Sequence, residues 1–71
     1  MSKRKLRKAL RRIENCCQAA SPVLDLRELD LIELPQSIFE LTHLTELDVS
    51  FNKLTALPPE IGELTALVEL Y

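Results

Sequence analysis

Small and apolar residues of the first segment recur every three to four positions, which predicts an amphipathic α-helix. They are Leu6, Leu10, Ile13, Cys17 and Ala20. Ser2 is a suitable N-cap residue. The pair Ser21-Pro22 ends the helix, because the residue before a proline is disfavoured in the α region. We therefore predict that residues 1–21 form one helix.

From residue 22 onward the pattern changes to a repeat with a period of 23 residues. Eleven of the 23 positions that begin at Leu24 carry the same residue in the next copy, which begins at Leu47. Leu70 then opens a third copy, and the sequence ends at Tyr71. A period in this range indicates units that bury their apolar edges by stacking on one another. We expect residues 22–71 to form two full repeats and the start of a third.

Each repeat is predicted to contain a short strand, a turn and a compact return. The run Leu44-x-x-Leu47-x-Val49 alternates apolar and polar positions, as a strand with one buried face does. Asn52 follows where the chain leaves the strand, and its side-chain amide can bond free backbone groups there. The run Ile61-x-x-Leu64-x-x-Leu67 has a spacing near three, which suits a short helical or 3₁₀ return. Stacked copies would pair their strands in a parallel sheet.

The second copy closely resembles the leucine-rich-repeat family. The matching run is Leu44-x-x-Leu47-x-Val49-x-x-Asn52-x-Leu54-x-x-Leu57-Pro58-x-x-Ile61-x-x-Leu64. Its Leu-Pro-x-x-Ile part is similar to the intracellular Ras-group type and to the repeat arm of Roco-type GTPases. The resemblance covers residues 22–71. It implies an α/β leucine-rich-repeat solenoid with a short parallel sheet, in which residues 1–21 form a basic amphipathic capping helix. It further implies that the concave face of the sheet binds proteins.

Two features of the repeats mark the ends of the array. Leu29 and Ser21 stand where the next copy has Asn52 and Leu44, so the first repeat is atypical, as a terminal repeat is. At the other end, the array has about two repeats where three or more are normal, and it lacks a polar cap. The edge at Leu70 is therefore expected to meet a second copy of the chain, downstream repeats or a partner.

Side chains that alternate with the buried strand leucines are expected on the concave face. The candidate partner-binding residues are Asp25, Arg27, Glu46, Asp48, Ser50, Glu69 and Tyr71. The repeat places Asp25 beside Asp48 and Glu46 beside Glu69. We call each such pair of side chains on neighbouring strands a rung, and a rung of like charges costs a few tenths of a kcal/mol. Two interpretations of this face are open: it is a binding site for a basic partner, or it is an acidic surface that only contacts solvent. The face covers about 200 Å², against about 800 Å² per partner in a standard interface, so binding by this face alone should be weak.

Charge is divided unevenly along the chain. Residues 1–12 carry seven basic and no acidic side chains, whereas residues 13–71 carry a net −9. A basic helix can serve as an anchor to nucleic acid or to an anionic membrane. The helix lacks the Trp and Phe that favour insertion, and the chain lacks a base-reading module with stacking aromatics. The sequence therefore favours a capping helix with a solvated polar face over either kind of anchor.

The candidate chemistry is sparse. Cys16 and Cys17 are adjacent and have no third cysteine to pair with, which favours a reducing, cytoplasmic location. We expect Cys17 to be a small core residue, Cys16 to be more exposed and His43 to lie on the surface. These three do not supply the four ligands of a zinc site. With one glycine, Gly62, there is no phosphate loop, so we predict neither enzymatic activity nor a cofactor.

The sequence thus predicts a scaffold for protein–protein interaction, with a role in intracellular signalling implied by the resemblance. The partner is another protein, and the acidic face favours a basic one. An alternative is that the chain is the N-terminal cap segment of a larger leucine-rich-repeat protein. Nucleic acid and anionic membrane are the less favoured partners.

Overall fold

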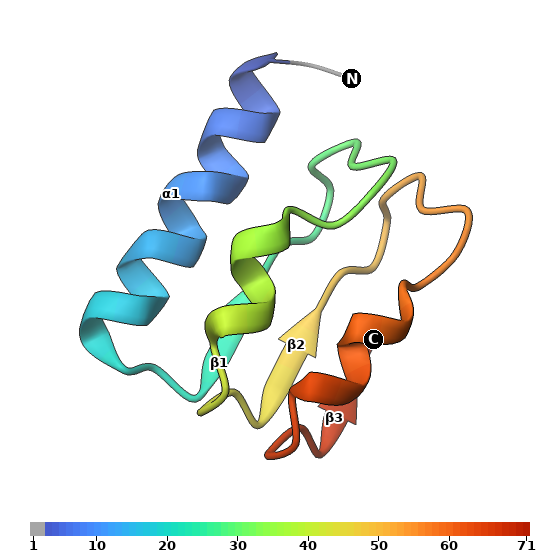
Figure 1. Cartoon of the computed structure of the whole chain (residues 1–71). Coiled ribbons are helices and arrows are strands. Elements are labelled where there is room, and N and C mark those ends of the chain that lie inside the picture. The colour runs from blue at the N-terminus through green and yellow to red at the C-terminus, as the bar shows by residue number, and fades with distance from the viewer. Residues whose placement is uncertain (1–2) are drawn as a thin grey trace.

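The computed structural model describes residues 3–71, so the predicted N-cap residue Ser2 lies outside the described part. One α-helix is followed by short strands that alternate with 3₁₀ helices (Figure 1). The elements are α1 (Lys3–Ala19), β1 (Val23–Asp25), η1 (Gln36–Glu40), β2 (Glu46–Asp48), η2 (Pro59–Glu63) and β3 (Glu69–Leu70). This order gives an α/β fold with one small sheet.

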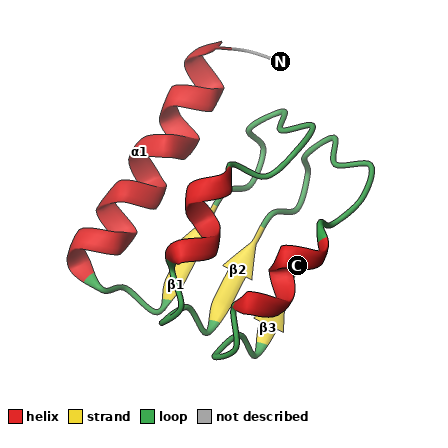
Figure 2. Cartoon of the chain, in the orientation of Figure 1, coloured by secondary structure: helices red, strands yellow, loops and turns green. Residues whose placement is uncertain are grey.

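The three strands form a parallel sheet in the order β1-β2-β3. Val23 pairs with Glu46 and Glu46 with Glu69, so neighbouring strands are offset by the 23-residue period of the sequence. The 3₁₀ helices lie together on one side of this sheet (Figure 2). Both the predicted strands and the predicted 3₁₀ returns are therefore confirmed.

The core lies between the sheet and the returns, and it consists mainly of leucine side chains from the first copy of the repeat. Several equivalent positions of the second copy are more exposed, although Leu47 and Leu64 are themselves buried. Leu34 is 6% exposed and its counterpart Leu57 is 44% exposed. Leu47 is fully buried in the middle strand, whereas Leu70 in the edge strand β3 is 41% exposed. Burial thus decreases toward β3 because each repeat is covered by the one that follows it.

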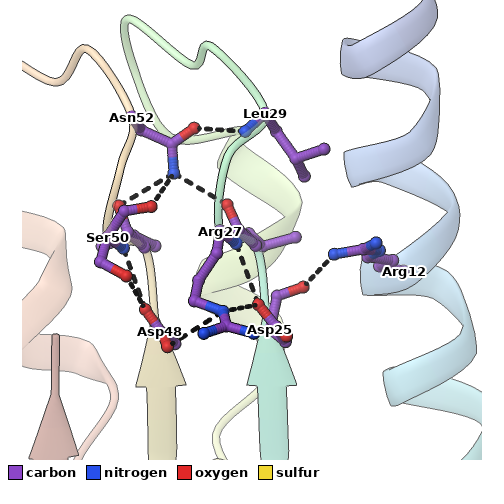
Figure 3. Close-up of polar contacts among 9 residues, drawn as sticks. Arg12, Asp25, Arg27, Leu29, Asp48, Ser50 and Asn52 are labelled. Atoms are coloured by element: carbon purple, nitrogen blue, oxygen red, sulfur yellow. Dashed lines mark hydrogen bonds and ion pairs between the residues drawn. The ribbon is translucent and has the colours of Figure 1, made fainter.

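Asn52 ties the two repeats together through their backbones. Its Oδ1 accepts hydrogen bonds from the N–H groups of Leu29 and Leu31, each at 3.0 Å. Its Nδ2 donates to the carbonyl oxygens of Leu26, Val49 and Ser50 at 2.8, 2.9 and 3.2 Å (Figure 3). The predicted turn role of Asn52 is confirmed. The structure adds that three of its five bonds reach back into the first repeat.

The buried face of α1 differs from the predicted one by about one residue. Ala9, Ile13 and Cys16 are buried, whereas Leu10 is 43% exposed and Cys17 lies in solvent. The expectation that Cys17 is the core residue and Cys16 the exposed thiol was therefore wrong. The small side chains of Ala9 and Cys16 let α1 approach the chain around β1 closely, and Cys16 Sγ donates to the Ser21 carbonyl at 3.3 Å. Two larger side chains on that face would hold the helix further away.

The end of α1 follows from a left-handed residue. Ala20 has φ 50°, and the Ser21 N–H bonds the Cys16 carbonyl at 3.0 Å while the Ala20 N–H bonds the Cys17 carbonyl at 3.3 Å. This is the Schellman arrangement, which satisfies the last carbonyls of a helix. The helix therefore ends at Ala19, two residues before the predicted end at residue 21, and β1 begins at Val23.

Candidate functional site

The sheet presents one face away from the 3₁₀ helices, and the predicted binding residues gather there. We call this surface the acidic face. It comprises Val23, Asp25 and Arg27 of the first repeat, Glu46, Asp48 and Ser50 of the second, and Glu69 and Tyr71 at the edge. The predicted rungs are confirmed, because Asp25 pairs with Asp48 and Glu46 pairs with Glu69 in the sheet register.

Asp25 and Asp48 each bond the turn that follows their own strand. Asp25 Oδ1 accepts the Arg27 N–H at 3.0 Å, and Asp48 Oδ1 accepts the Ser50 N–H at the same distance. The Ser50 hydroxyl also donates to Asp48 Oδ1 at 2.6 Å. This hydroxyl bond is the main reason that the pKa of the Asp48 carboxyl lies below its ordinary value, and the Ser50 N–H and Arg27 lower it further. Both aspartates therefore have a structural use within their repeats.

Arg27 neutralises part of the rung between these aspartates. Its Nε lies 3.3 Å from Asp25 Oδ1 and 3.5 Å from Asp48 Oδ2, so one guanidinium bridges the two strands (Figure 3). The sequence placed Arg27 on this face but gave no sign of the bridge, because it depends on how the side chain turns across the strands. Like charges at this rung are thus held together by a cation between them.

The second rung has no such cation. Within residues 3–71, no basic side chain forms an ion pair with Glu46 or Glu69. The Tyr71 hydroxyl donates a hydrogen bond to Glu69, and this bond together with the Glu69 charge raises the pKa of Tyr71 above its ordinary value. The face thus carries four carboxylates and one guanidinium, a net of three negative charges, and three of the carboxylates lie on β2 and β3.

Arg12 connects α1 to this face, and sequence reasoning missed it. Its guanidinium donates to the Asp25 carbonyl at 3.0 Å (Figure 3). The Leu26 N–H bonds the corresponding Asp48 carbonyl at 2.8 Å, so Arg12 occupies the position that a preceding strand would take. A second link is Asp30, which lies 2.8 Å from Lys5 Nζ and 3.8 Å from Lys53 Nζ. No local sequence signal relates residues this far apart.

The groups considered for metal chemistry do not converge. His43 is half-buried, and its Nε2 lies 3.9 Å from Cys16 Sγ. Burial, with a contribution from Cys17, raises the pKa of the Cys16 thiol, which disfavours the thiolate that binds metals. Across the described residues, no three His, Cys, Asp or Glu side chains cluster as a metal site would need.

Comparison with known proteins bears on the family. No family model matches the chain. It is 46% identical over 61 residues to the leucine-rich repeat protein SHOC-2 of Danio rerio, which covers 86% of the chain. It is 36% identical over 58 residues, or 82% of the chain, to the leucine-rich repeat protein soc-2 homolog of Drosophila erecta. These relatives support a place for the chain among the leucine-rich-repeat proteins.

The matches cover only a small part of each relative. The chain spans 11% of SHOC-2 and 9% of the soc-2 homolog. A uridine 5'-monophosphate transferase of Xanthomonas campestris is also 42% identical over 59 residues, and the chain spans 11% of it. Segments similar to this chain therefore occur in relatives with different names, and the transferase activity is a property of that protein. Within residues 3–71, no helix is long and apolar enough to span a membrane.

Proposed function

We propose that the chain binds a protein partner on its acidic face and that this partner presents basic side chains there. The observation that carries the proposal is the rung of Glu46 and Glu69, whose charges have no cationic partner among residues 3–71. Parallel pairing places Glu46 and Glu69 side by side on neighbouring strands, whose backbones lie about 4.8 Å apart. A lysine or arginine brought between them would relieve a repulsion that the isolated chain retains.

The edges of this rung suit a protein partner better than a lone ion. Tyr71 is 57% exposed beside Glu69, and Val23 at the other end of the same row is 45% exposed. Tyrosine is enriched in protein interfaces because it offers a large, stiff surface with a polar tip. Asp25, Arg27, Asp48 and Ser50 bond one another, so in this proposal they border the site and hold its shape.

The wider architecture belongs to the same proposal. We take residues 22–71 as the first repeats of a solenoid whose sheet is concave on the acidic side, and residues 1–21, which contain α1, as its cap. Arg12 supports this assignment, because it satisfies the Asp25 carbonyl at the outer edge of β1. The Leu-Pro-x-x-Ile form of the repeat adds an expected cytoplasmic role in signalling, as a scaffold without catalysis or cofactor.

The test is a pair of charge-reversal variants with the same repeat spacing. E46K/E69K should lower affinity for a fluorescent oligolysine peptide by about tenfold or more, since like charge then faces the cation. The control E40K/E63K reverses two exposed glutamates on the 3₁₀ layer, also one repeat apart, and should change affinity much less. Binding is measured by fluorescence anisotropy at low salt, with thermal melts of both variants. Equal losses in the two variants would contradict the acidic-face assignment.

A second candidate function is to begin a longer repeat array, and the edge of β3 favours it. The Pro22 carbonyl accepts the Thr45 and Glu46 N–H groups, and the Thr45 carbonyl accepts those of Val68 and Glu69. One period further on, the Val68 carbonyl holds the same position at the outer edge. Together with the exposed Leu57 and Leu70, it offers a surface on which another repeat would fit.

This edge gives a measurable expectation for the isolated 71-residue chain. We expect it to self-associate as its concentration rises, because solvent-exposed leucine side chains and an unpaired strand edge favour pairing with a second copy. Sedimentation velocity across concentration measures this, and an extra repeat added after Tyr71 should abolish it. A monodisperse monomer at high concentration, with a cooperative melt above about 60 °C, would show that α1 and two repeats suffice.

A further inference from the structure

Four cationic side chains form a stripe on the side of α1 that faces away from the fold. Arg4, Arg7, Lys8 and Arg11 follow the spacing i, i+3, i+4, i+7, so they lie on one helix face. At 100° per residue their mean direction is roughly opposite to that of the buried Ala9, Ile13 and Cys16. The four side chains line a common hollow on the helix surface. We call this feature the basic stripe.

The basic stripe has no electrostatic partner within the chain. Among residues 3–71, none of its four members forms an ion pair or a side-chain hydrogen bond. Other cations of the same molecule do contact oxygen atoms. Lys5 and Lys53 pair with Asp30, and Arg12 bonds the Asp25 carbonyl. Four like charges within about 10 Å along an N-terminal helix half oppose both one another and the helix dipole. Their placement therefore lowers the stability of the fold, and an anion from outside the chain would relieve this repulsion.

We propose that the basic stripe adsorbs α1 to an anionic phospholipid surface, with the helix lying along the surface and no side chain inserted. Clusters of four or more Lys and Arg on an amphipathic helix are suited to phosphatidylserine and phosphoinositide headgroups. Most of the apolar face of α1 is packed against β1 and η1, with Leu10 43% exposed, so little of this face is available to the acyl chains. The lack of Trp and Phe in α1 weighs against insertion but has no bearing on electrostatic adsorption.

A planar anion fits the charge distribution better than a nucleic acid strand does. Glu14 is the one acidic residue among the described positions of α1, and it lies on the side that carries the basic stripe. A flat surface that touches this side stays clear of the acidic face, because the sheet lies on the opposite side of the helix (Figure 1). A flexible nucleic acid strand gains from stacking on aromatic side chains. No aromatic residue lies in Lys3–Ala19.

The test compares two variants with the same change in net charge. R7Q/R11Q removes two charges from the basic stripe, and T42E/T65E adds two negative charges at exposed turn positions one repeat apart. Binding is measured by co-sedimentation with vesicles of about 30% phosphatidylserine in phosphatidylcholine. Each lost stripe charge should lower partitioning about fivefold, so R7Q/R11Q should lose about 25-fold. T42E/T65E should lose much less, and pure phosphatidylcholine should bind none of the proteins. Added salt should release the protein.

Several outcomes would overturn the proposal. They are retained binding by R7Q/R11Q, an equal loss in T42E/T65E, or equal binding to pure phosphatidylcholine. Tighter binding to poly(U) RNA than to the vesicles at the same salt, lost in R7Q/R11Q, would assign the stripe to nucleic acid instead. The helix should remain in R7Q/R11Q, because glutamine has a helix propensity close to that of arginine. Circular dichroism checks this.

Discussion

Leu47→Ala is expected to lower the free energy of unfolding by ~2–5 kcal/mol, as truncation of a buried leucine does. Leu47 is fully buried in β2, between the neighbours Leu24 and Leu70 of the parallel register. Strands on both sides restrain the backbone around it, so the cavity cannot close by a local shift. Urea unfolding followed by circular dichroism gives the measurement. So small a core has only a few kcal/mol to lose, and the variant should be largely unfolded at 37 °C.

Leu70→Ala is the matched control, because Leu70 holds the same repeat position in the edge strand. Its side chain is 41% exposed, so the same truncation removes less buried surface and leaves no enclosed cavity. We expect a loss of about 1 kcal/mol or less. Similar losses at the two positions would contradict the stacking order, in which β2 is central and β3 is the edge.

Asn52→Ala is expected to destabilise the chain by about 3 kcal/mol, at the upper end of the cost of leaving part-buried backbone groups unpaired. The amide serves five backbone groups, including the N–H groups of Leu29 and Leu31 in the preceding repeat. Alanine offers none of these bonds. An unchanged thermal melt would show that water replaces the amide without loss.

N52D separates the two halves of the amide. Its carboxylate still accepts from Leu29 and Leu31 but faces the carbonyl oxygens of Leu26, Val49 and Ser50, to which it cannot donate. The pKa of this carboxyl should therefore be raised in the folded state. When the pKa of a carboxyl is higher in the folded state than in the unfolded state, its contribution to stability is present at low pH. That contribution is lost as pH rises through the folded-state pKa. N52D should thus gain stability relative to the parent on acidification. A constant difference between the two from pH 4 to pH 7 would contradict the donor role.

The periodic features of this fold could be predicted from the sequence because they repeat. Identity between copies 23 residues apart predicted the sheet register, the 3₁₀ returns and the rungs of Asp25 with Asp48 and of Glu46 with Glu69. Asn52 was predictable because a turn amide has few uses other than to bond the backbone around it. The binding role of the acidic face remains a prediction.

Tertiary structure alone decided which face of α1 is buried. Cys16 and Cys17 differ by about 100° around the helix axis. The close approach of α1 to β1 selects the helix face that carries the small side chains of Ala9 and Cys16. The bridge by Arg27 and the bond from Arg12 to the Asp25 carbonyl arise in the same way, from elements brought together in space. Sequence by itself thus determined the period, the strands and the turns, because these depend on neighbouring residues. Helix rotation and charge pairing depend on the distance between packed elements, which only the folded chain sets.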